Sequence, residues 1–414
     1  MVVGKACRRF GLASSVALTG FLAFAYPANA EEKAVAKVVV TGNGAELGET
    51  PLLAEVAAKV PPGSYRMRAE SGGPTRFANV YQEGDKTYLA TVVDRIPAKG
   101  NVTYSLERAS KVDRSTEGVS IVESSPGDVV VSIDGKPFTT YLANQGARPY
   151  YFPLIGPSGT AVTRAYPMKT VEGEKRDHPH HQSLWFTHGN VNGVDFWSNA
   201  KGHGTVKEIT RKFPTAGPAL AQIQTTDDWV GPDGKVICKD ERTVGFFDTH
   251  DSRVIDFSIV VRALDKPVTF GATKEGSFAI RVATSMDVTS KKGGKITNSE
   301  GLTDDATWSK PAKWVDYVGP VAGETVGITI LNHPASFRYP TTWHVRTYGL
   351  FAANPFGGKD FGPNAPGNYV INPGQSIRFD YRVIVHKGDT ASAKPGASFE
   401  AYANPPKVEV SLVP

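Results

Sequence analysis

The sequence predicts an all-β protein, with a small N-terminal β domain followed by a large antiparallel β-sandwich. Short segments that alternate apolar and polar residues, or are rich in β-branched residues, recur along most of the chain between Gly and Pro pairs. Amphipathic helical periodicity is almost absent, and only residues 51–59 are predicted to be helical. Many strands without crossover helices favour antiparallel sheets that pack face to face.

Two Asp-Gly pairs support this fold class. Asp134-Gly135 and Asp233-Gly234 each lie between strand-like segments, and Asp-Gly is a preferred sequence for the tight turn of a β-hairpin. Later segments continue the strand pattern, and residues 253–264 place Ile255, Phe257 and Ile259 on one face. The sandwich is therefore expected to be built largely from hairpins.

The first thirty residues are typical of an export signal. A basic start with Lys5, Arg8 and Arg9 precedes a short apolar run over residues 12–25, and residues 28–30 (Ala-Asn-Ala) supply small residues for cleavage. We therefore expect a periplasmic or secreted protein, cleaved after Ala30. The alternative is a membrane anchor, but the apolar run is shorter than the roughly 20 residues that a spanning helix needs. The Arg pair leaves twin-arginine export open beside the general secretory route.

The remaining chain is predicted to form two domains. Residues 35–112 contain four strand-like segments and are expected to fold as the small β domain. The polar stretch over residues 111–118 is a candidate linker. Residues 119–414 are then long enough to form a large sandwich.

Composition excludes several partners and chemistries. The net charge is only +5 and the basic residues are scattered, so no nucleic-acid surface is expected. No further apolar stretch could span a bilayer, so no membrane partner is expected after signal cleavage. Cys238 would be the only cysteine of the mature chain, which excludes an intramolecular disulfide; a buried inert thiol is favoured over a nucleophile. Sequence patterns of a serine-hydrolase elbow, a P-loop and a dinucleotide fingerprint are absent.

The most informative stretch runs from Arg148 to Trp197 and holds four of the nine histidines. Mixed aromatic, cationic and amide side chains are typical of binding surfaces rather than of cores. On a strand, His178 and His180 would face one side and His181 the other. Three interpretations stand: acid–base or sugar contacts, a divalent metal bound by His178, His180 and His181, and structural histidines. The candidate residues of this stretch are Arg148, Arg164, His180, His181, His188 and Asn190.

A second candidate segment, residues 274–281, places charges in an otherwise apolar strand. Glu275 could act as a general base, with its pKa adjusted by Lys274 or Arg281. The alternative is a structural ion pair at a strand end. The sequence leaves the two open.

A third segment, residues 333–357, carries Trp343, His344, Arg346 and Tyr348. It could be an edge strand with solvated charges, or it could meet the histidine stretch in a shared pocket. Residues 307–317 are expected to form a loop in which Trp308, Trp314 and Asp316 either stack on a ligand ring or cover the core. Together these residue types suit a polyhydroxylated ligand, so a small-molecule carbohydrate is the expected partner.

These segments also carry a family resemblance. Residues 148–164 (RPYYFPLIGPSGTAVTR), 177–197 (DHPHHQSLWFTHGNVNGVDFW), 274–281 (KEGSFAIR) and 333–357 (HPASFRYPTTWHVRTYGLFAANPFG) resemble, in order, the bacterial PmoA-like family of unknown function. The match covers roughly residues 120–390. Members often carry a methane oxygenase label, and we do not expect that activity here because the mature sequence has no membrane span.

The order of elements, including the closing strand at residues 379–389, is also similar to the galactose mutarotase-like β-supersandwich. The resemblance implies acid–base chemistry of the aldose epimerase kind. One of His180, His181 or His188 would be the acid and Glu275 the base, while Arg148, Arg281, His344 and Arg346 would hold substrate hydroxyls or a carboxylate. We therefore expect an epimerase- or lyase-type activity without a cofactor, with a non-catalytic carbohydrate-binding protein and a His-cluster metalloprotein as the alternatives.

Overall fold

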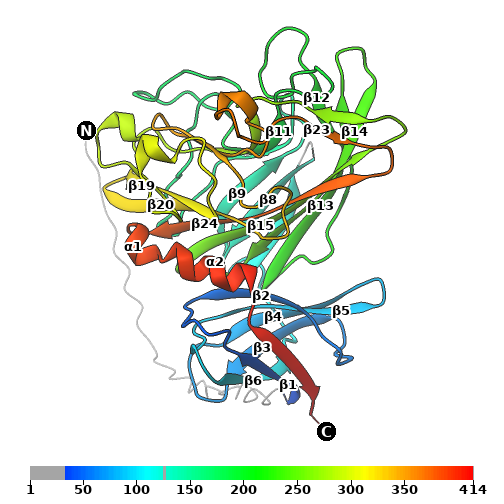
Figure 1. Cartoon of the computed structure of the whole chain (residues 1–414). Coiled ribbons are helices and arrows are strands. Elements are labelled where there is room, and N and C mark those ends of the chain that lie inside the picture. Colours follow the sequence, from blue (N-terminus) through cyan, green and yellow to red (C-terminus); the bar gives the residue numbers. More distant parts are fainter. Residues whose placement is uncertain (1–32, 125–126, 414) are drawn as a thin grey trace, which may run out of the picture. The chain divides into compact units, whose positions relative to one another are not determined.

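Alternation of buried and exposed side chains builds a seven-stranded antiparallel sheet at the N-terminal end of the described chain. The computed structural model describes residues 33–124 and 127–413; the predicted export signal lies outside them. Every second residue of the first strand, Ala36, Val38 and Val40, is buried. In spatial order the strands are β2 (Thr50–Glu55), β5 (Lys86–Val93), β4 (Arg76–Glu83), β3 (Gly63–Ala69), β6 (Asn101–Arg108), β1 (Ala34–Thr41) and β25 (Lys407–Leu412) (Figure 1).

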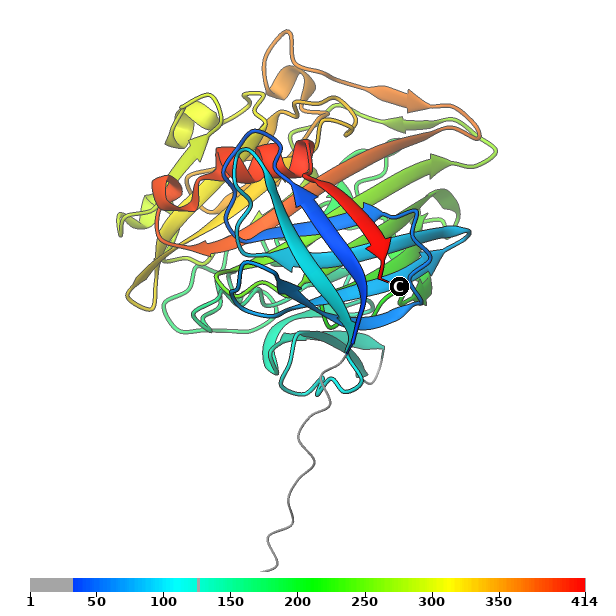
Figure 2. The ribbon, with the colours of Figure 1, turned by 90° about the horizontal axis from the view of Figure 1, so that it is seen from below.

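The last strand of the chain completes this first sheet. β25 pairs with β1 so that Val410 lies opposite Val38, and Figure 2 shows the two strands side by side. The sequence predicts residues 119–414 as one sandwich domain, whereas the end of that range joins the N-terminal sheet. Residues 33–414 form one compact unit.

The predicted helix over residues 51–59 is wrong. Residues 50–55 form the edge strand β2, which pairs along its whole length with β5. Leu52 is buried and Leu53 is 43% exposed, which is the alternation of a strand. Pairing and burial therefore override the helical preference of Leu, Ala and Glu, and Pro51 is tolerated because the strand lies at the sheet edge.

Two eight-stranded antiparallel sheets form the larger part of the chain, which confirms the all-β prediction. The first runs β21 (Trp343–Val345), β22 (Leu350–Ala353), β17 (Gly276–Arg281), β11 (Leu184–His188), β10 (Tyr150–Tyr151), β9 (Lys136–Leu142), β8 (Asp128–Ile133) and β7 (Val119–Ser124). The second runs β12 (Thr205–Lys212), β13 (Leu220–Val230), β14 (Val236–Phe247), β15 (Ser252–Ala263), β24 (Ser376–Lys387), β20 (Glu324–Asn332), β19 (Trp314–Val321) and β18 (Lys295–Asn298).

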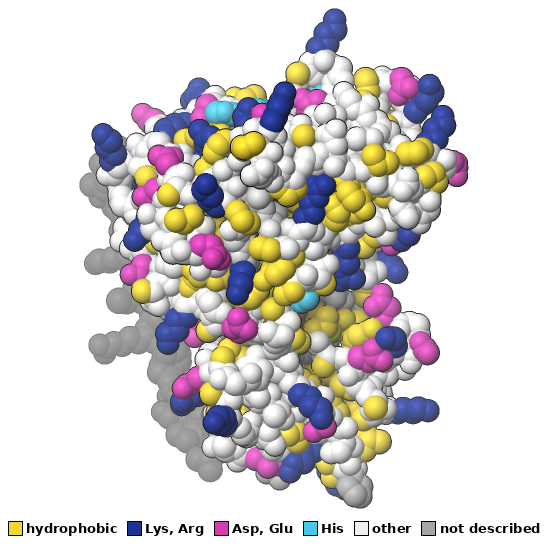
Figure 3. Space-filling view, in the orientation of Figure 1, with side chains coloured by type: hydrophobic (Ala, Val, Ile, Leu, Met, Phe, Trp, Pro, Cys, Tyr) yellow, Lys and Arg dark blue, Asp and Glu magenta, His cyan; other side chains and the backbone are white. Residues whose placement is uncertain are grey.

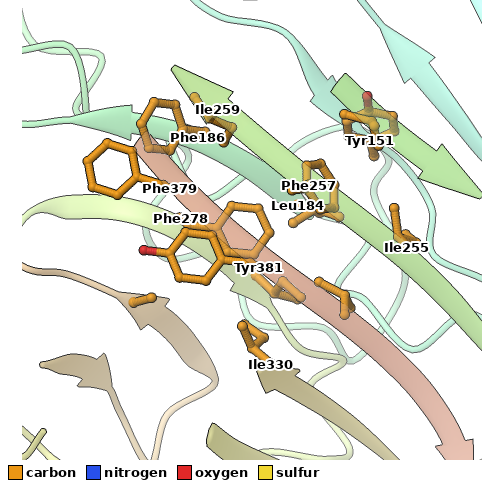
Figure 4. Packing of buried hydrophobic residues seen from close by; sticks show 14 of the residues in the cluster. Tyr151, Leu184, Phe186, Ile255, Phe257, Ile259, Phe278, Ile330, Phe379 and Tyr381 are labelled. Atoms are coloured by element: carbon orange, nitrogen blue, oxygen red, sulfur yellow. The ribbon is translucent and has the colours of Figure 1, made fainter. Parts of the chain in front are cut away.

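The hydrophobic core lies between these two sheets (Figure 4). Phe278 of β17 packs between Phe257 and Tyr381 of the opposite sheet, with ring centroids 4.9 Å and 4.6 Å away. Phe186 of β11 meets Phe379 at 5.6 Å. Facing aromatic and branched side chains thus bury both inner faces, as in a sandwich.

Both hairpins expected at Asp-Gly pairs are present. Asp134 and Gly135 join β8 to β9 with φ values of 49° and 71°, as a two-residue hairpin turn of the primed type requires. The second pair lies in the longer loop between β13 and β14, where the amide of Gly231 donates to the carbonyl of Lys235 at 2.8 Å.

Few other elements complete the described chain. A two-stranded sheet joins β16 (Val268–Phe270) to β23 (Tyr369–Ile371). The helices are η1 (Val288–Ser290), η2 (Asp304–Thr307), η3 (Gly358–Asp360), α1 (Thr390–Ala393) and α2 (Pro395–Ala403). In the described residues, no helix is long and apolar enough to cross a membrane. Basic and acidic side chains are interspersed over the face drawn in Figure 3.

Candidate functional site

Three of the four histidines between Arg148 and Trp197 lie on a loop, which we call the histidine loop (residues 177–183), immediately before β11. The amide of His181 donates to the carbonyl of His178 at 3.0 Å, and His178 and Ser183 have φ values of 47° and 58°. The predicted strand through these residues is therefore wrong, because two positive φ angles interrupt any extended chain. The turn stacks His178 on His181 at 4.7 Å and places His180 beside both.

Two fully buried arginines hold the backbone of this loop. Arg148 donates from Nη1 to the carbonyl of His180 at 3.1 Å and from Nη2 to Oδ1 of Asn199 at 3.2 Å. Arg164 donates from Nη2 to the carbonyls of Asp177 and His178 at 2.8 Å and 3.1 Å. Burial lowers the pKa of Arg148 to about 10. Both predicted substrate-binding arginines thus position the loop instead of pointing at a ligand.

Arg281, at the end of β17, ties the loop to the sheet. Its Nη2 donates to Oδ1 of Asp177 at 3.0 Å, and its Nη1 lies 2.9 Å from Nδ1 of His181. Arg164 also pairs with Asp177 through Nη1. Burial raises the pKa of Asp177, but the two guanidinium groups and His178 outweigh it and lower the value to about 2. A charged network therefore lies beneath the histidines.

The two predicted catalytic histidines are neutral at neutral pH. Burial, followed by the charge of Arg148, lowers the pKa of His180 to about 4. Burial and the charge of Arg281 lower the pKa of His181 well below its ordinary value. A neutral imidazole accepts or donates a hydrogen bond but does not deliver an imidazolium proton. The geometry thus favours ligand contacts over the role of cationic acid that the family resemblance implies.

The third sequence segment meets the histidine loop at Tyr348, which confirms that the segments converge. The Tyr348 ring stacks on His178 with centroids 5.2 Å apart and planes 7° from parallel. Arg281 and Arg346 lie over the same ring at 5.1 Å and 5.6 Å, and Arg346 also lies 5.2 Å from the ring of Trp308. Imidazole, phenol, guanidinium and indole thus form one continuous aromatic and cationic surface.

Glu275 lies next to this surface, just before β17 and not within an apolar strand as predicted. Its Oε1 is 3.4 Å from Nζ of Lys274, and the two side chains are 35% and 48% exposed. The charge of Glu275 also contributes to the raised pKa of Tyr348, whose main cause is burial. The carboxylate is therefore solvent-accessible and within electrostatic reach of Tyr348, which keeps both interpretations of the Lys274–Glu275 pair open.

Several polar atoms in this region have no hydrogen-bond partner among the described residues, although they are buried. They include the indole N–H groups of Trp185 and Trp197, whose rings flank His181 at 5.5 Å and 5.9 Å. A cavity of about 590 Å³ lies beside the loop, lined in part by Pro179, Gln182 and Asn199. Gln182 Oε1 also lacks a donor within the described chain. Buried polar atoms of this kind are satisfied by water or ligand groups.

Three predicted binding residues do not reach this surface. His188 is fully buried between Phe270 and Phe356, with Nε2 donating to the carbonyl of Gly271 at 2.8 Å. Asn190 accepts from the amide of Gly193 at 3.1 Å and shapes a turn. Trp343 is fully buried and donates to the carbonyl of Ala312 at 3.0 Å. These contacts favour a structural role for the three side chains.

Two further expectations need correction. His344 is 2% exposed and burial lowers its pKa to about 3, so it offers a neutral ring from beneath the surface near Trp308. Trp314 and Asp316 lie on strand β19 and not in a loop. Asp316 is fully buried and 3.0 Å from Nε2 of His386; only Trp308 of that stretch adjoins the site.

The side chains that could hold a metal ion differ from the predicted ones. Among the described residues, the group of His, Cys, Asp or Glu side chains that brings three ligand atoms within 4.8 Å of one another is Asp134, Asp248 and His250, not the three loop histidines. Sequence reasoning missed this triad because its members come from two turns far apart in the sequence. It also underrated Asp177, although the aspartate directly precedes the histidine run, and Tyr348, although it alternates with His344 and Arg346.

Similar solved structures are distant. An alpha-mannosidase from Enterococcus faecalis matches with a TM-score of 0.40 at 9% identity, over 92% of this chain and 46% of that one. A glycosyl hydrolase family 38 protein from the same organism gives 0.38 at 11%, over 92% and 47%. A GH36 alpha-galactosidase from Geobacillus stearothermophilus gives 0.36 at 9%, over 65% and 41%. This chain spans less than half the length of each.

A family profile gives a direct assignment. No curated protein sequence matches the chain at a significant level. The profile described as "Family of unknown function (DUF6807)" matches residues 128–400, well over half of the chain, including the histidine loop and Tyr348. The resemblance to the PmoA-like family stays a prediction. The chain therefore belongs to the DUF6807 family of unknown function.

Proposed function

We propose that the surface formed by the histidine loop, Tyr348 and Trp308 binds a carbohydrate that carries a carboxylate. The observation that carries the proposal is the placement of Arg346. Its guanidinium lies over Trp308 and Tyr348 at 5.2 Å and 5.6 Å, and no ion pair to it is found among the described residues. By contrast, Arg164 and Arg281 are already paired with Asp177. A ligand carboxylate would supply the partner of Arg346.

The other parts of the surface suit the remaining groups of a sugar. Trp308 offers an aromatic face against which the C–H face of a pyranose can pack, and Tyr348, stacked on His178, supports Arg346. His180 and His178 are only partly buried and offer ring nitrogens to hydroxyl groups. Because His180 is neutral at neutral pH, it can donate or accept a hydrogen bond without repelling Arg346. Small-molecule sites typically combine a mainly apolar lining with a small number of polar groups.

In the same proposal Glu275 acts as a general base. Pairing of the ligand carboxylate with Arg346 acidifies the adjacent C–H bond, and Glu275 takes that proton. Return of a proton to the opposite face of the carbon gives the epimer. Expulsion of the oxygen substituent on the next carbon, protonated as it leaves, gives an unsaturated sugar instead. Both outcomes are redox-neutral and need no cofactor.

The test uses the full chain with glucuronate and galacturonate, and with glucose and galactose for comparison. We expect the uronates to raise the melting temperature and the neutral sugars to do so less. In D₂O, proton NMR should show loss of the C5 proton signal as deuterium enters. Arg346→Met should weaken uronate binding at least tenfold, whereas Arg262→Met should not, because Arg262 is an exposed arginine of β15 paired with Glu241. Equal binding by all four sugars would contradict the proposal.

A second candidate function is carbohydrate binding without chemistry. It is favoured by one observation: Glu275 is already paired with Lys274 at 3.4 Å, as a surface ion pair would be. Glu275→Gln separates the two candidates. Under the catalytic proposal the variant binds uronate but exchanges no deuterium. Under the binding proposal neither protein exchanges deuterium, and the affinity changes less than about threefold.

The export signal predicted for residues 1–30 would place this chemistry outside the cytoplasm. N-terminal sequencing of protein recovered from the periplasm or the medium tests it. A mature chain that begins at Glu31 is the expected result, and recovery of the intact N-terminus in the cytoplasm would contradict it.

A further inference from the structure

Two turns of the sandwich bring Asp134, Asp248 and His250 together. Asp134 occupies the tight turn between β8 and β9, and the other two lie in the short loop between β14 and β15. One ligand atom from each side chain lies within 4.8 Å of the other two. Nε2 of His250 is 3.6 Å from Oδ2 of Asp134, and these two side chains are 47% and 40% exposed. The group is therefore open to solvent on one side.

Asp248 forms the closed side of this group. The residue is 4% exposed, and its Oδ1 has no hydrogen-bond donor among the described residues. Leaving a buried carboxylate oxygen without a partner is costly. A bound cation is one of the few partners that satisfies such an oxygen beside a second carboxylate.

The charges around the group also leave room for a cation. Three carboxylates, those of Asp134, Asp248 and Glu49, lie within electrostatic reach of one another and of His250, and the guanidinium groups of Arg76 and Arg253 accompany them. Arg76 pairs with Glu49 at 3.3 Å and also with Asp94. Arg253 instead donates to the carbonyls of Thr249 and Ser252, both at 2.8 Å. The carboxylates thus outnumber the guanidinium groups, which favours a bound cation.

We propose that Asp134, Asp248 and His250 bind one divalent transition-metal ion, with Zn²⁺ the best fit. Zn²⁺ accepts three protein ligands of mixed nitrogen and oxygen type and completes its tetrahedron with water. Ca²⁺ prefers six to eight oxygen ligands, and Mg²⁺ prefers an octahedral oxygen shell. The imidazole and the small number of ligands therefore select zinc or a similar ion over both.

Glu49 completes the site from the N-terminal sheet. A metal at Nε2 of His250 requires the ring proton on Nδ1, and Oε1 of Glu49 lies 3.6 Å from that nitrogen. In the structure Arg76 donates to Nδ1 of His250. When a metal binds Nε2, the ring proton therefore moves to Nδ1, and Arg76 keeps Glu49 and Asp94 as its partners. Glu49 further accepts the amides of His250 and Asp251 at 2.7 Å and 3.1 Å. The ion would thus fasten the loop between β14 and β15 to the β8–β9 hairpin and to the first sheet.

The experiment measures zinc on the full chain, purified without a His tag and treated with EDTA. ZnCl₂ alone is the ligand in calorimetry, and CaCl₂ and MnCl₂ are its comparisons. We expect one zinc per chain and a higher melting temperature that EDTA reverses. Asp134→Asn and His250→Gln should each weaken zinc binding at least tenfold. Both positions are partly exposed, and asparagine tolerates the positive φ of Asp134, so these variants should fold.

Asp233→Asn is the matched control, because Asp233 is an exposed aspartate in the other Asp-Gly hairpin loop. Its zinc affinity should equal that of the wild type. Asp248→Asn should also bind zinc more weakly, with circular dichroism as its folding check. The proposal is overturned if the wild type binds no zinc, if Asp134→Asn and His250→Gln bind it as the wild type does, or if binding disappears only when His178 or His180 is replaced.

Discussion

Nδ1 of His181 lies 2.9 Å from Nη1 of Arg281, with both side chains buried. A guanidinium group has only donors, so Nδ1 of His181 must accept and the ring proton must lie on Nε2. The same guanidinium pairs with Asp177 at 3.0 Å. One arginine therefore fixes the charge of the aspartate and the tautomer of the histidine, and it joins the histidine loop to β17.

The first prediction concerns this tautomer. His181 should remain neutral from about pH 8 down to its ordinary pKa near 6.5, because burial and Arg281 lower its pKa well below that value. Nitrogen-15 NMR of the histidine rings should show a bare Nδ1 and a protonated Nε2 over this range. A His181 ring that titrates near pH 6.5, or one protonated at Nδ1, would contradict the assignment.

The second prediction concerns stability against pH. Burial lowers the pKa of His188 to about 4, against about 6.5 in the unfolded chain. Between these values the unfolded chain holds a proton that the folded chain lacks, so the free energy of unfolding falls as pH falls. The contribution, about 3 kcal/mol for a fully buried ring, is complete above about pH 6.5 and lost by about pH 4.

Urea unfolding at a series of pH values measures this slope. His188→Gln keeps an amide donor for the carbonyl of Gly271 but removes the titration. The variant should therefore lose less stability between about pH 6.5 and 4, by up to about 1.4 kcal/mol per pH unit. Parallel curves for the wild type and the variant would show that His188 does not carry the effect.

The all-β fold could be predicted from the sequence because alternation and hairpin turns are local signals. The helix prediction for residues 51–59 failed because their intrinsic propensity is helical, whereas in the fold residues 50–55 pair with β5. Strand β5 is distant in sequence, so local propensity does not reveal this pairing. The strand prediction for the histidine loop failed for a related reason. The residue types at positions 177–183 do not reveal the positive φ angles of His178 and Ser183. These angles interrupt the strand and form the turn in which the imidazole rings stack.

The site was predictable as a region but not residue by residue. Aromatic, cationic and imidazole side chains marked three segments, and Tyr348 joins the first to the third through His178. Burial decides which members face outward, and burial depends on the whole fold. His188 and Trp343 carry the same chemistry as their neighbours yet lie in the core, whereas Asp134 and Asp248 became neighbours only through sheet packing.

The third prediction concerns a buried charge cluster in the second sheet. Arg242 donates to both oxygens of Asp240 at 2.8 Å, and it lies 3.4 Å from the fully buried Asp227. Arg242→Met leaves the buried carboxylate of Asp240 without its cation. We expect a loss of about 3–5 kcal/mol in the free energy of unfolding, measured in urea.

Arg262→Met, on the neighbouring strand, is the matched comparison for that substitution. Arg262 pairs with Glu241 at 3.6 Å, and the two side chains are 45% and 58% exposed. Exposed pairs contribute little, so this variant should lose less than about 1 kcal/mol. Similar losses in the two arginine variants would show that burial of the Arg242 cluster does not determine its contribution.

The last prediction separates the ring of Tyr348 from its hydroxyl group. The ring stacks on His178 at 5.2 Å and lies beneath Arg281 and Arg346, so Tyr348→Phe keeps the stack whereas Tyr348→Ala removes it. We expect Tyr348→Ala to weaken uronate binding by about 1–2 kcal/mol, roughly the value of a desolvated cation–π contact. Tyr348→Phe should bind within about threefold of the wild type in calorimetry. If Tyr348→Phe instead binds as poorly as Tyr348→Ala, the hydroxyl group contacts the ligand and the ring does not act by supporting Arg346.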